Sequence, residues 1–268
     1  MSENTLITQI QNRSLQIFIE FQKICKRNNL RYFMIGGSCL GAVRHCGFIP
    51  WDDDIDIGMP RKDYEKFLKI AHRELPEYLF LQNHFTDKEY IFNFSKIRDS
   101  RTSFIEKSVE PFDINHGLYI DIFPLDGYKS SRKFDLLNKL LNARVYCRFR
   151  KNKFKNLIII ILSLCIAQTS ERACEKRDTL LKSIDYDDSE IIANFCGAWG
   201  IKEIVPREYF GDGIEVTFEH VKVIIPEKYD LYLKQLYGNY LKLPPEEKRI
   251  THHETTVIDL NKSYLEYR

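Results

Sequence analysis

The 268-residue sequence lacks several features that would assign it to a specialised class of protein. It has no run of about 20 apolar residues, so we expect no membrane-spanning helix. Its N-terminus lacks a basic region followed by an apolar one, so we expect no secretory signal. Its seven cysteines form no CxxC pair, and this odd number indicates reduced thiols in a cytosolic protein. A net charge of +2 argues against a dedicated binder of nucleic acid or another polyanion.

What is present is the composition of an ordinary folded protein, with 44% hydrophobic and 29% charged residues. Apolar residues at helical spacing predict an amphipathic helix over 5–28. The order of helix, strand, helix, strand and then several strands predicts an α/β (α+β) fold, a mixed sheet flanked by helices. We expect strands at 31–36, 54–59, 78–83, 92–98, 102–106 and 118–125, and helices at 39–46, 61–75 and 226–239.

A soft boundary near residue 128 divides the chain into two parts. Residues 1–128 would form a catalytic core. Residues 129–268 would form a helical, basic insertion and a mixed α/β C-terminal extension that completes the active site. A single domain is the alternative.

The most informative stretch pairs a Gly36-Gly37-Ser38 turn with an alternating Asp-Ile-Asp-Ile segment. Side chains alternate faces along a strand, so Asp54 and Asp56 point the same way while the isoleucines enter the core. Two adjacent carboxylates repel each other, but they suit a hard divalent cation such as Mg²⁺. The alternative is a solvated charged loop, in which Asp52 and Asp53 would also lie. The pattern favours transfer of a phosphorus-containing group.

The longer string GAVRHCGFIPWDDDIDIGMPRKDYEKF (41–67) resembles the LicD family within the nucleotidyltransferase superfamily. The resemblance continues in KIRDSRT (96–102), GLYIDIFPLDG (117–127) and YGNYLKLPPEEKRITHH (237–253). It implies an enzyme that moves phosphocholine or a related phospho-alcohol from a CDP-activated donor onto a glycan. It also implies a nucleotidyltransferase-like fold and a third aspartate that binds metal or acts as the base.

Asp121 is the best candidate for that third carboxylate, because it is a lone acid in the apolar run LYIDIF. A buried carboxylate needs a partner, and the alternative is a solvent-exposed strand position. We therefore predict Asp54, Asp56 and Asp121 as catalytic and metal-binding residues, with Mg²⁺ or Mn²⁺ as cofactor. Asp126 precedes a glycine, which favours a turn.

Candidate substrate-binding residues surround these acids. Gly36, Gly37 and Ser38 would form a phosphate turn, because glycine lets backbone amides approach a phosphate closely. Basic side chains would contact the donor's pyrophosphate or close the site, and the alternatives are surface positions or, for His252 and His253, a zinc site. These residues are Arg44, His45, Lys96, Arg98, Arg249, His252 and His253.

The segment 148–168 has five basic residues before an eleven-residue apolar run, 157–167. A buried helix is the slightly favoured interpretation. The alternative is an interfacial element whose basic residues contact anionic headgroups, namely Arg148, Arg150, Lys151, Lys153 and Lys155.

Together these features predict a metal-dependent, LicD-type phosphotransferase. Its expected partners are a CDP-linked donor and a glycan acceptor, which a lipid could carry. The expected location is the cytoplasm, with a peripheral fraction at the inner face of the cell membrane. The alternatives are a nucleotidyltransferase that uses a nucleoside triphosphate and a non-catalytic module that binds nucleotide or glycan.

Overall fold

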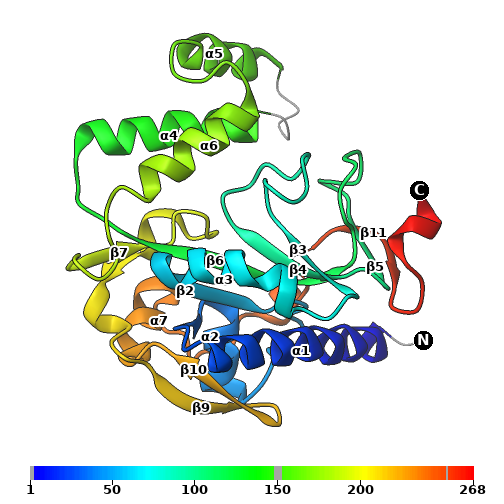
Figure 1. The fold of residues 1–268 in the computed structure, drawn as a ribbon. Helices are drawn as coiled ribbons and strands as arrows, with labels where there is room; N and C mark the ends of the chain where they lie inside the picture. Colours follow the sequence, from blue (N-terminus) through cyan, green and yellow to red (C-terminus); the bar gives the residue numbers. More distant parts are fainter. Residues whose placement is uncertain (1–2, 148–152, 252) are drawn as a thin grey trace.

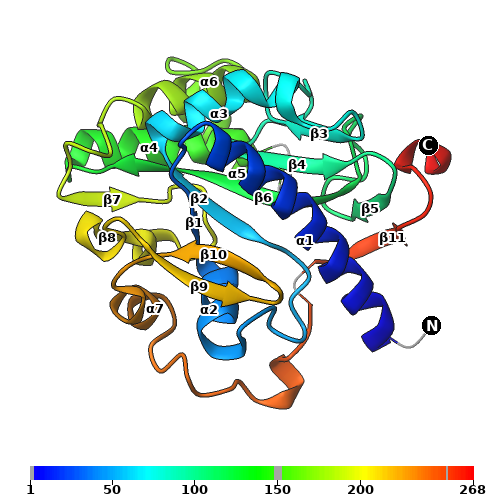
Figure 2. The same cartoon turned by 60° about the horizontal axis from the view of Figure 1, so that its bottom comes forward.

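The computed structural model describes residues 3–147, 153–251 and 253–268. They form a mixed sheet flanked by helices (Figure 1, Figure 2), so the predicted α/β (α+β) class is confirmed. The main sheet has the strand order β1-β2-β6-β4-β3, in which β2 and β6 run parallel and the other neighbours antiparallel. These strands are β1 (Phe33–Met34), β2 (Asp56–Pro60), β3 (Leu79–Gln82), β4 (Ser95–Asp99) and β6 (Leu118–Gly127). The sheet continues from the end of β6 through β7 (Ile191–Ala193) to β8 (Ile204–Pro206).

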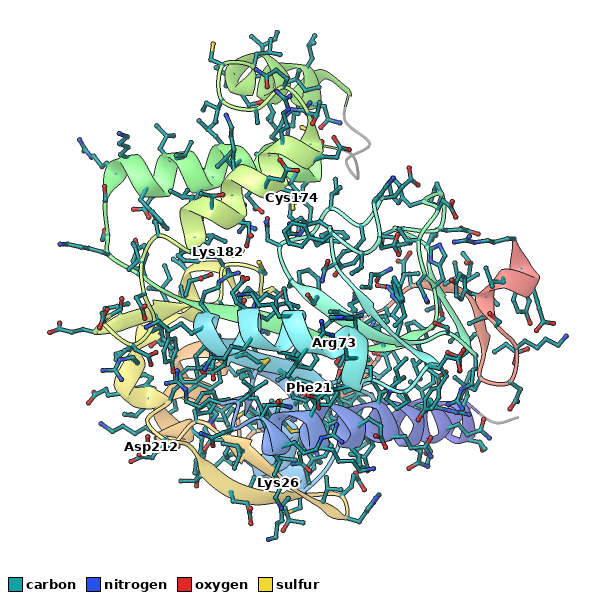
Figure 3. All side chains as sticks on the ribbon, in the orientation of Figure 1. Phe21, Lys26, Arg73, Cys174, Lys182 and Asp212 are labelled. Carbon is teal, nitrogen blue, oxygen red and sulfur yellow. The ribbon has the colours of Figure 1, made fainter. Side chains whose placement is uncertain are left out.

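Helices α1 (Glu3–Arg27) and α3 (Arg61–Glu74) pack on the central strands. Figure 3 shows Phe21 where α1 and α3 meet, and its ring makes an edge contact with Phe67 at 5.1 Å between centroids. Ile57, Ile120 and Ile122 belong to the same buried cluster. Side chains alternate along a strand, so Asp121, which lies between Ile120 and Ile122, points to the face of the sheet opposite to this buried cluster.

Two predicted elements differ from the observed ones near the acidic motif. The Gly-Gly-Ser segment is the first turn of α2 (Gly36–His45) rather than a turn before a helix. Gly36 has φ +54°, a left-handed conformation that glycine adopts without strain, so the chain passes directly from β1 into α2. Strand β2 begins at Asp56, and Asp54 therefore precedes it.

The region expected to be helical contains α4 (Arg132–Tyr146), α5 (Lys153–Ser163) and α6 (Ser170–Leu181). These helices lie beyond one end of the sheet, with α5 the farthest from it (Figure 1). The expectation that 157–167 is a buried helix is wrong, because Leu157, Ile161 and Leu162 are more than half exposed. Among the described residues, no helix combines the length and the apolar character needed to cross a bilayer.

The C-terminal part returns to the main sheet region. β9 (Ile214–Phe218) and β10 (Val221–Ile225) form a hairpin, and α7 (Tyr229–Tyr237) packs against α2. β11 (Thr255–Asp259) pairs antiparallel with β5 (Ser103–Glu106) and so carries the tail back to the first half of the chain. The boundary near 128 falls just after β6 and stays a prediction. Short 3₁₀ helices are η1 (Gly200–Glu203), η2 (Arg207–Tyr209), η3 (Glu246–Lys248) and η4 (Tyr264–Tyr267).

The expectation that Asp126 lies in a turn is also wrong. Asp126 is a fully buried residue of β6. Its two carboxylate oxygens accept hydrogen bonds from Arg61 Nε at 2.6 Å and Nη2 at 2.8 Å. A partner 65 residues away therefore overrides the local turn preference of an Asp-Gly pair.

Candidate active site

Three charged residues form a row across three adjacent strands. Asp56 of β2 is in register with Asp121 of β6, and Asp121 is in register with Lys96 of β4. Residues in register share a face of the sheet, so the three side chains are neighbours. Lys96 Nζ lies 2.8 Å from Asp121 Oδ1 and 3.3 Å from the centre of the Tyr119 ring. The partner that the sequence required for Asp121 is thus Lys96.

Asp54 completes a cluster of three carboxylates. One oxygen of each of Asp54, Asp56 and Asp121 lies within 4.8 Å of the other two. Burial, with repulsion from Asp54 and Asp121, raises the pKa of Asp56. Burial also raises the pKa of Asp54, to about 6, although His253 works in the opposite direction. The raised pKa values show that the three negative charges are under-compensated by the protein itself.

His253 enters this cluster from the C-terminal tail, 200 residues after Asp53 in the chain. Its Nδ1 lies 2.8 Å from Asp53 Oδ1, and its Nε2 lies 3.8 Å from Asp54 Oδ2. Burial alone would lower the pKa of His253, but the hydrogen bond to Asp53 and the charge of Asp54 raise it to about 9. His253 is therefore a cation at neutral pH that neutralises part of the cluster. The pairing of β11 with β5 is what places it there.

The N-terminal end of α2 lies against the same acids. The Asp56 backbone N–H donates to Ser38 Oγ at 2.8 Å, and the Gly36 N–H donates to the Tyr232 hydroxyl at 3.1 Å. A Cβ added at Gly36 would lie 3.1 Å from Asp56 Oδ2, and one added at Gly37 would lie 2.8 Å from Asp52 Oδ2. Both glycines therefore allow the acidic motif to approach the helix N-terminus closely.

Other predicted residues lie at the periphery of this group and bind protein atoms. Arg44 Nη1 donates to the Tyr240 carbonyl at 2.7 Å, and His45 makes an edge contact with Trp51. Arg249 donates to the Pro244 carbonyl and its guanidinium lies 5.7 Å from the centre of the Trp51 ring. His252 lies outside the described residues. Roles for these four in substrate binding stay predictions.

Arg98 does not fit the role of a donor-pyrophosphate contact. It is 1% exposed. Its Nε donates to Gln82 Oε1 and its Nη1 donates to the Gly117 carbonyl. A substrate phosphate would have to displace these bonds from inside the protein, so Arg98 supports the strands rather than the substrate.

Two further residues belong to the surroundings of the cluster. Asp53, which the sequence analysis placed only in the alternative solvated loop, holds His253. Tyr237 was not singled out, yet its hydroxyl lies 3.9 Å from where a Gly36 Cβ would be. Burial and the nearby charge of Asp56 raise the pKa of Tyr237, so it stays a neutral donor. In the sequence, Tyr237 is the first residue of the motif YGNYLKLPPEEKRITHH, and this position is the feature that could have identified it.

The cluster also fits a divalent cation by its chemistry. Hard cations such as Mg²⁺ and Mn²⁺ prefer oxygen ligands, and three converging carboxylates supply them. Asp52 and Asp53, together with Asp54, make a second group of oxygens within 4.8 Å of one another, so the surroundings are strongly acidic. Burial, and after it repulsion between the aspartates, raises the pKa values of Asp52 and Asp56, and a bound cation would favour their ionised forms.

Comparison with known proteins agrees with this geometry. The family described as "LicD/FKTN/FKRP, nucleotidyltransferase domain" matches residues 29–160, which include the three acids and the N-terminus of α2. The Haemophilus influenzae protein named "Lipopolysaccharide cholinephosphotransferase LicD" is 29% identical over 252 residues, 89% of this chain and 92% of that protein. The human protein named "Ribitol 5-phosphate transferase FKRP" is 28% identical over 89 residues, 33% of this chain and 18% of that protein.

The mixed sheet, with an Asp-x-Asp pair beside a helix N-terminus and a third aspartate on the adjacent parallel strand, defines an enzyme of the nucleotidyltransferase-like class. Residues 29–160 of this chain match the LicD family, and together with the 29% identity to the Haemophilus protein over most of the chain this supports a phosphotransferase of the LicD type.

Proposed function

We propose that this enzyme transfers a phospho-alcohol group, phosphocholine or a similar one, from a CDP-linked donor to a hydroxyl of a cell-surface glycan. The observation that carries the proposal is the convergence of Asp54, Asp56 and Asp121 within 4.8 Å beside α2. The names of the relatives support the reaction class, since one is a cholinephosphotransferase acting on lipopolysaccharide and another a ribitol 5-phosphate transferase.

The donor's phosphates would lie between the acid cluster and the N-terminal turn of α2. A helix N-terminus attracts anions through its free N–H groups and its dipole. Gly36 and Gly37 place no side chain at the first two positions of this turn. Asp54, Asp56 and Asp121 would hold Mg²⁺ or Mn²⁺, which when bound neutralises charge on phosphoryl oxygens.

The acceptor hydroxyl would attack the phosphorus distal to cytidine, so CMP leaves and a phosphodiester to the glycan forms. Asp121 is the proposed base, because burial raises its pKa above that of an ordinary aspartate and a raised pKa makes a carboxylate a better proton acceptor. Lys96, 2.8 Å from Asp121, moderates this shift and keeps the carboxylate ionised before the reaction. The protonated His253 would hold Asp53 and Asp54 in place.

The test is a donor screen on purified protein. CDP-choline, CDP-ribitol and CDP-glycerol are each incubated with Mg²⁺ and a glycan acceptor, and released CMP is measured. We expect CMP release with one of the three, loss of turnover with EDTA, and recovery with excess Mg²⁺ or Mn²⁺. Pyrophosphate release from a nucleoside triphosphate would instead identify a nucleotidyltransferase, and the absence of any metal-dependent turnover would identify a binding module.

We also propose that the enzyme works in the cytoplasm at the inner face of the cell membrane, where a lipid carrier could present the acceptor. Seven cysteines without any disulfide in the described residues are compatible with a reducing compartment. Cell fractionation with detection of the native protein tests this location.

A further inference from the structure

Helix α5 exposes its apolar side. Four large side chains on it are exposed by 43–61%, namely Leu157, Ile158, Ile161 and Leu162. At about 100° per residue these four positions fall within one arc of the helix, roughly 140° wide. Leu164, just after the helix, is also exposed. An apolar stripe of this kind normally faces a core.

The opposite side of α5 carries the polar residues and faces the protein. Asn156 Nδ2 donates to the Cys147 carbonyl at 3.0 Å. Ser163 is fully buried, and its hydroxyl donates to the Ile159 carbonyl at 2.7 Å. The inner side of α5 thus carries an amide and a hydroxyl group beside the half-buried Ile159 and Ile160, while four large apolar side chains face outward. Its outward apolar face needs a cover that the described residues do not supply.

The position of α5 lets a large, flat partner reach this face. Its main packing contact is with α4, and it lies on the side of α4 and α6 that is away from the sheet (Figure 1). The sticks on α5 at the edge of the molecule extend outward in Figure 3. Neither the acid cluster nor the α2 N-terminus lies on these helices, so binding here would leave the proposed active site accessible.

The charge around α5 indicates which kind of partner would bind its apolar face. The sequence from 136 to 170 has seven basic residues and no acidic one, whereas the rest of the chain has a net charge of −5. Lys153 is the first residue of α5, and Lys155, two residues further on, is exposed. Two copies of this segment would repel each other across a shared interface, but an anionic lipid surface would attract it.

We propose that the outer face of α5 is a docking site for an anionic lipid surface, into which Leu157, Ile158, Ile161 and Leu162 insert. Neighbouring basic residues would contact the headgroups, as in other interfacial helices with an apolar face and basic flanks. Docking of α5 on lipid is independent of the chemistry at the acid cluster, so it stands or falls separately from the proposed donor and acceptor.

The experiment is vesicle flotation of the whole protein. The phosphatidylcholine vesicles either lack phosphatidylglycerol or contain it as about a third of the lipid. We expect binding to the anionic vesicles at low salt, a weaker signal at high salt, and little binding to pure phosphatidylcholine. The double variant Ile161→Ser/Leu162→Ser should lower the bound fraction about tenfold or more, because it removes two side chains that would insert. Lys153→Glu/Lys155→Glu should also lower it, and more strongly at low salt than at high salt.

Leu265→Ser is the matched control, since Leu265 is 58% exposed, like Ile161, but lies in η4 near the C-terminus. It should float like the unmodified protein. The changes at Lys155, Ile161, Leu162 and Leu265 affect exposed side chains, so we expect melting temperatures that agree with that of the unmodified protein, and each variant's melting temperature is measured as the check on folding. Failure of the unmodified protein to float with anionic vesicles would overturn the proposal. So would flotation that the Ile161/Leu162 variant does not weaken, or a dimer that this variant dissociates in the absence of lipid binding.

Discussion

Strand β6 carries a buried aspartate near each end, and the two are compensated in opposite ways. Asp126 shares two hydrogen bonds with Arg61, which in turn lies 3.1 Å from Asp178. Asp121 has Lys96 as its cation but is crowded by the carboxylates of Asp54 and Asp56. Burial raises the pKa of both groups, and their nearest cation lowers it.

The difference shows how one residue type on one strand serves two purposes. At the Asp126 end, an arginine fork satisfies the carboxylate inside the protein, so the charge holds α3 to β6. At the Asp121 end, carboxylates outnumber the cations Lys96 and His253, so their mutual repulsion is only partly offset by the protein. We expect changes at the first end to affect stability and changes at the second to affect activity.

The largest effect is expected for Asp56→Asn. Loss of one ligand from the carboxylate cluster should lower turnover about 1,000-fold or more. Stability measured without added metal should hold or rise, because the change removes one of several repelling charges. Turnover and thermal melting are measured together, with Asp212→Asn as the control at an exposed position labelled in Figure 3. Near-normal turnover of the folded Asp56→Asn protein would remove Asp56 from the site.

The reverse pattern is expected for Asp126→Ala. Removing this carboxylate leaves Arg61 buried without its bidentate partner, which should cost about 3–5 kcal/mol of unfolding free energy. Urea unfolding measures this loss, and the turnover of the protein that remains folded should be close to normal. Glu208→Ala, which breaks the exposed pair with Lys228, should leave the unfolding free energy nearly unchanged and serves as the control. An equally small loss for Asp126→Ala would break the distinction between the two ends of β6.

Glu203 is a third buried acid, and no ion pair involving it is found among the described residues. Burial raises its pKa to about 7, and the N–H of Trp199 and the side chain of Asn194 only partly offset this. Because the folded-state pKa is above the unfolded one, the folded protein binds more protons between about pH 4.5 and pH 7. Stability is therefore lost as the pH rises through that range. At about 1.4 kcal/mol per pKa unit, Glu203→Gln should be about 3 kcal/mol more stable than the unmodified protein at pH 8 and equal to it near pH 4.

Urea unfolding at several pH values checks this sign. A variant that is destabilised equally at pH 4 and pH 8 would show that the ionised carboxylate is satisfied in the folded protein. Such a result would place Glu203 with Asp126 rather than with the under-compensated acids.

Much of the site could be predicted from the sequence because its signals are local. The alternation of Asp54, Ile55 and Asp56 fixes which side chains share a direction, and the apolar run around Asp121 marks a buried strand with one charge. The helices α1, α3 and α7 follow from apolar spacing and, for α3, from Pro60 at its start.

The errors arose where a distant partner decides the outcome. The local Asp-Gly signal at Asp126 gave no hint of Arg61, and Arg98 looked available because Gln82 and Gly117 are far along the chain. His253 reaches Asp53 only through the pairing of β11 with β5. The run 157–167 contains a single polar residue, Ser163, so its periodicity could not show which side of the helix faces water.

The smallest expected effect concerns the approach of the donor to α2. It tests whether the N-terminus of this helix, beside the acid cluster at the Asp121 end of β6, binds the donor. Gly36→Ala places a Cβ on a residue with φ +54°, which costs about 1–2 kcal/mol of stability, and it brings that Cβ to 3.1 Å from Asp56 Oδ2. Gly200→Ala carries the same backbone cost, with φ +57°, but its Cβ would meet nothing within 4 Å. Both variants should therefore lose similar stability, and only Gly36→Ala should raise the KM for the donor, by roughly tenfold, because it crowds the space between α2 and the acids. If Gly200→Ala raised the KM as much as Gly36→Ala, the effect would come from backbone strain alone and the N-terminus of α2 would not bind the donor.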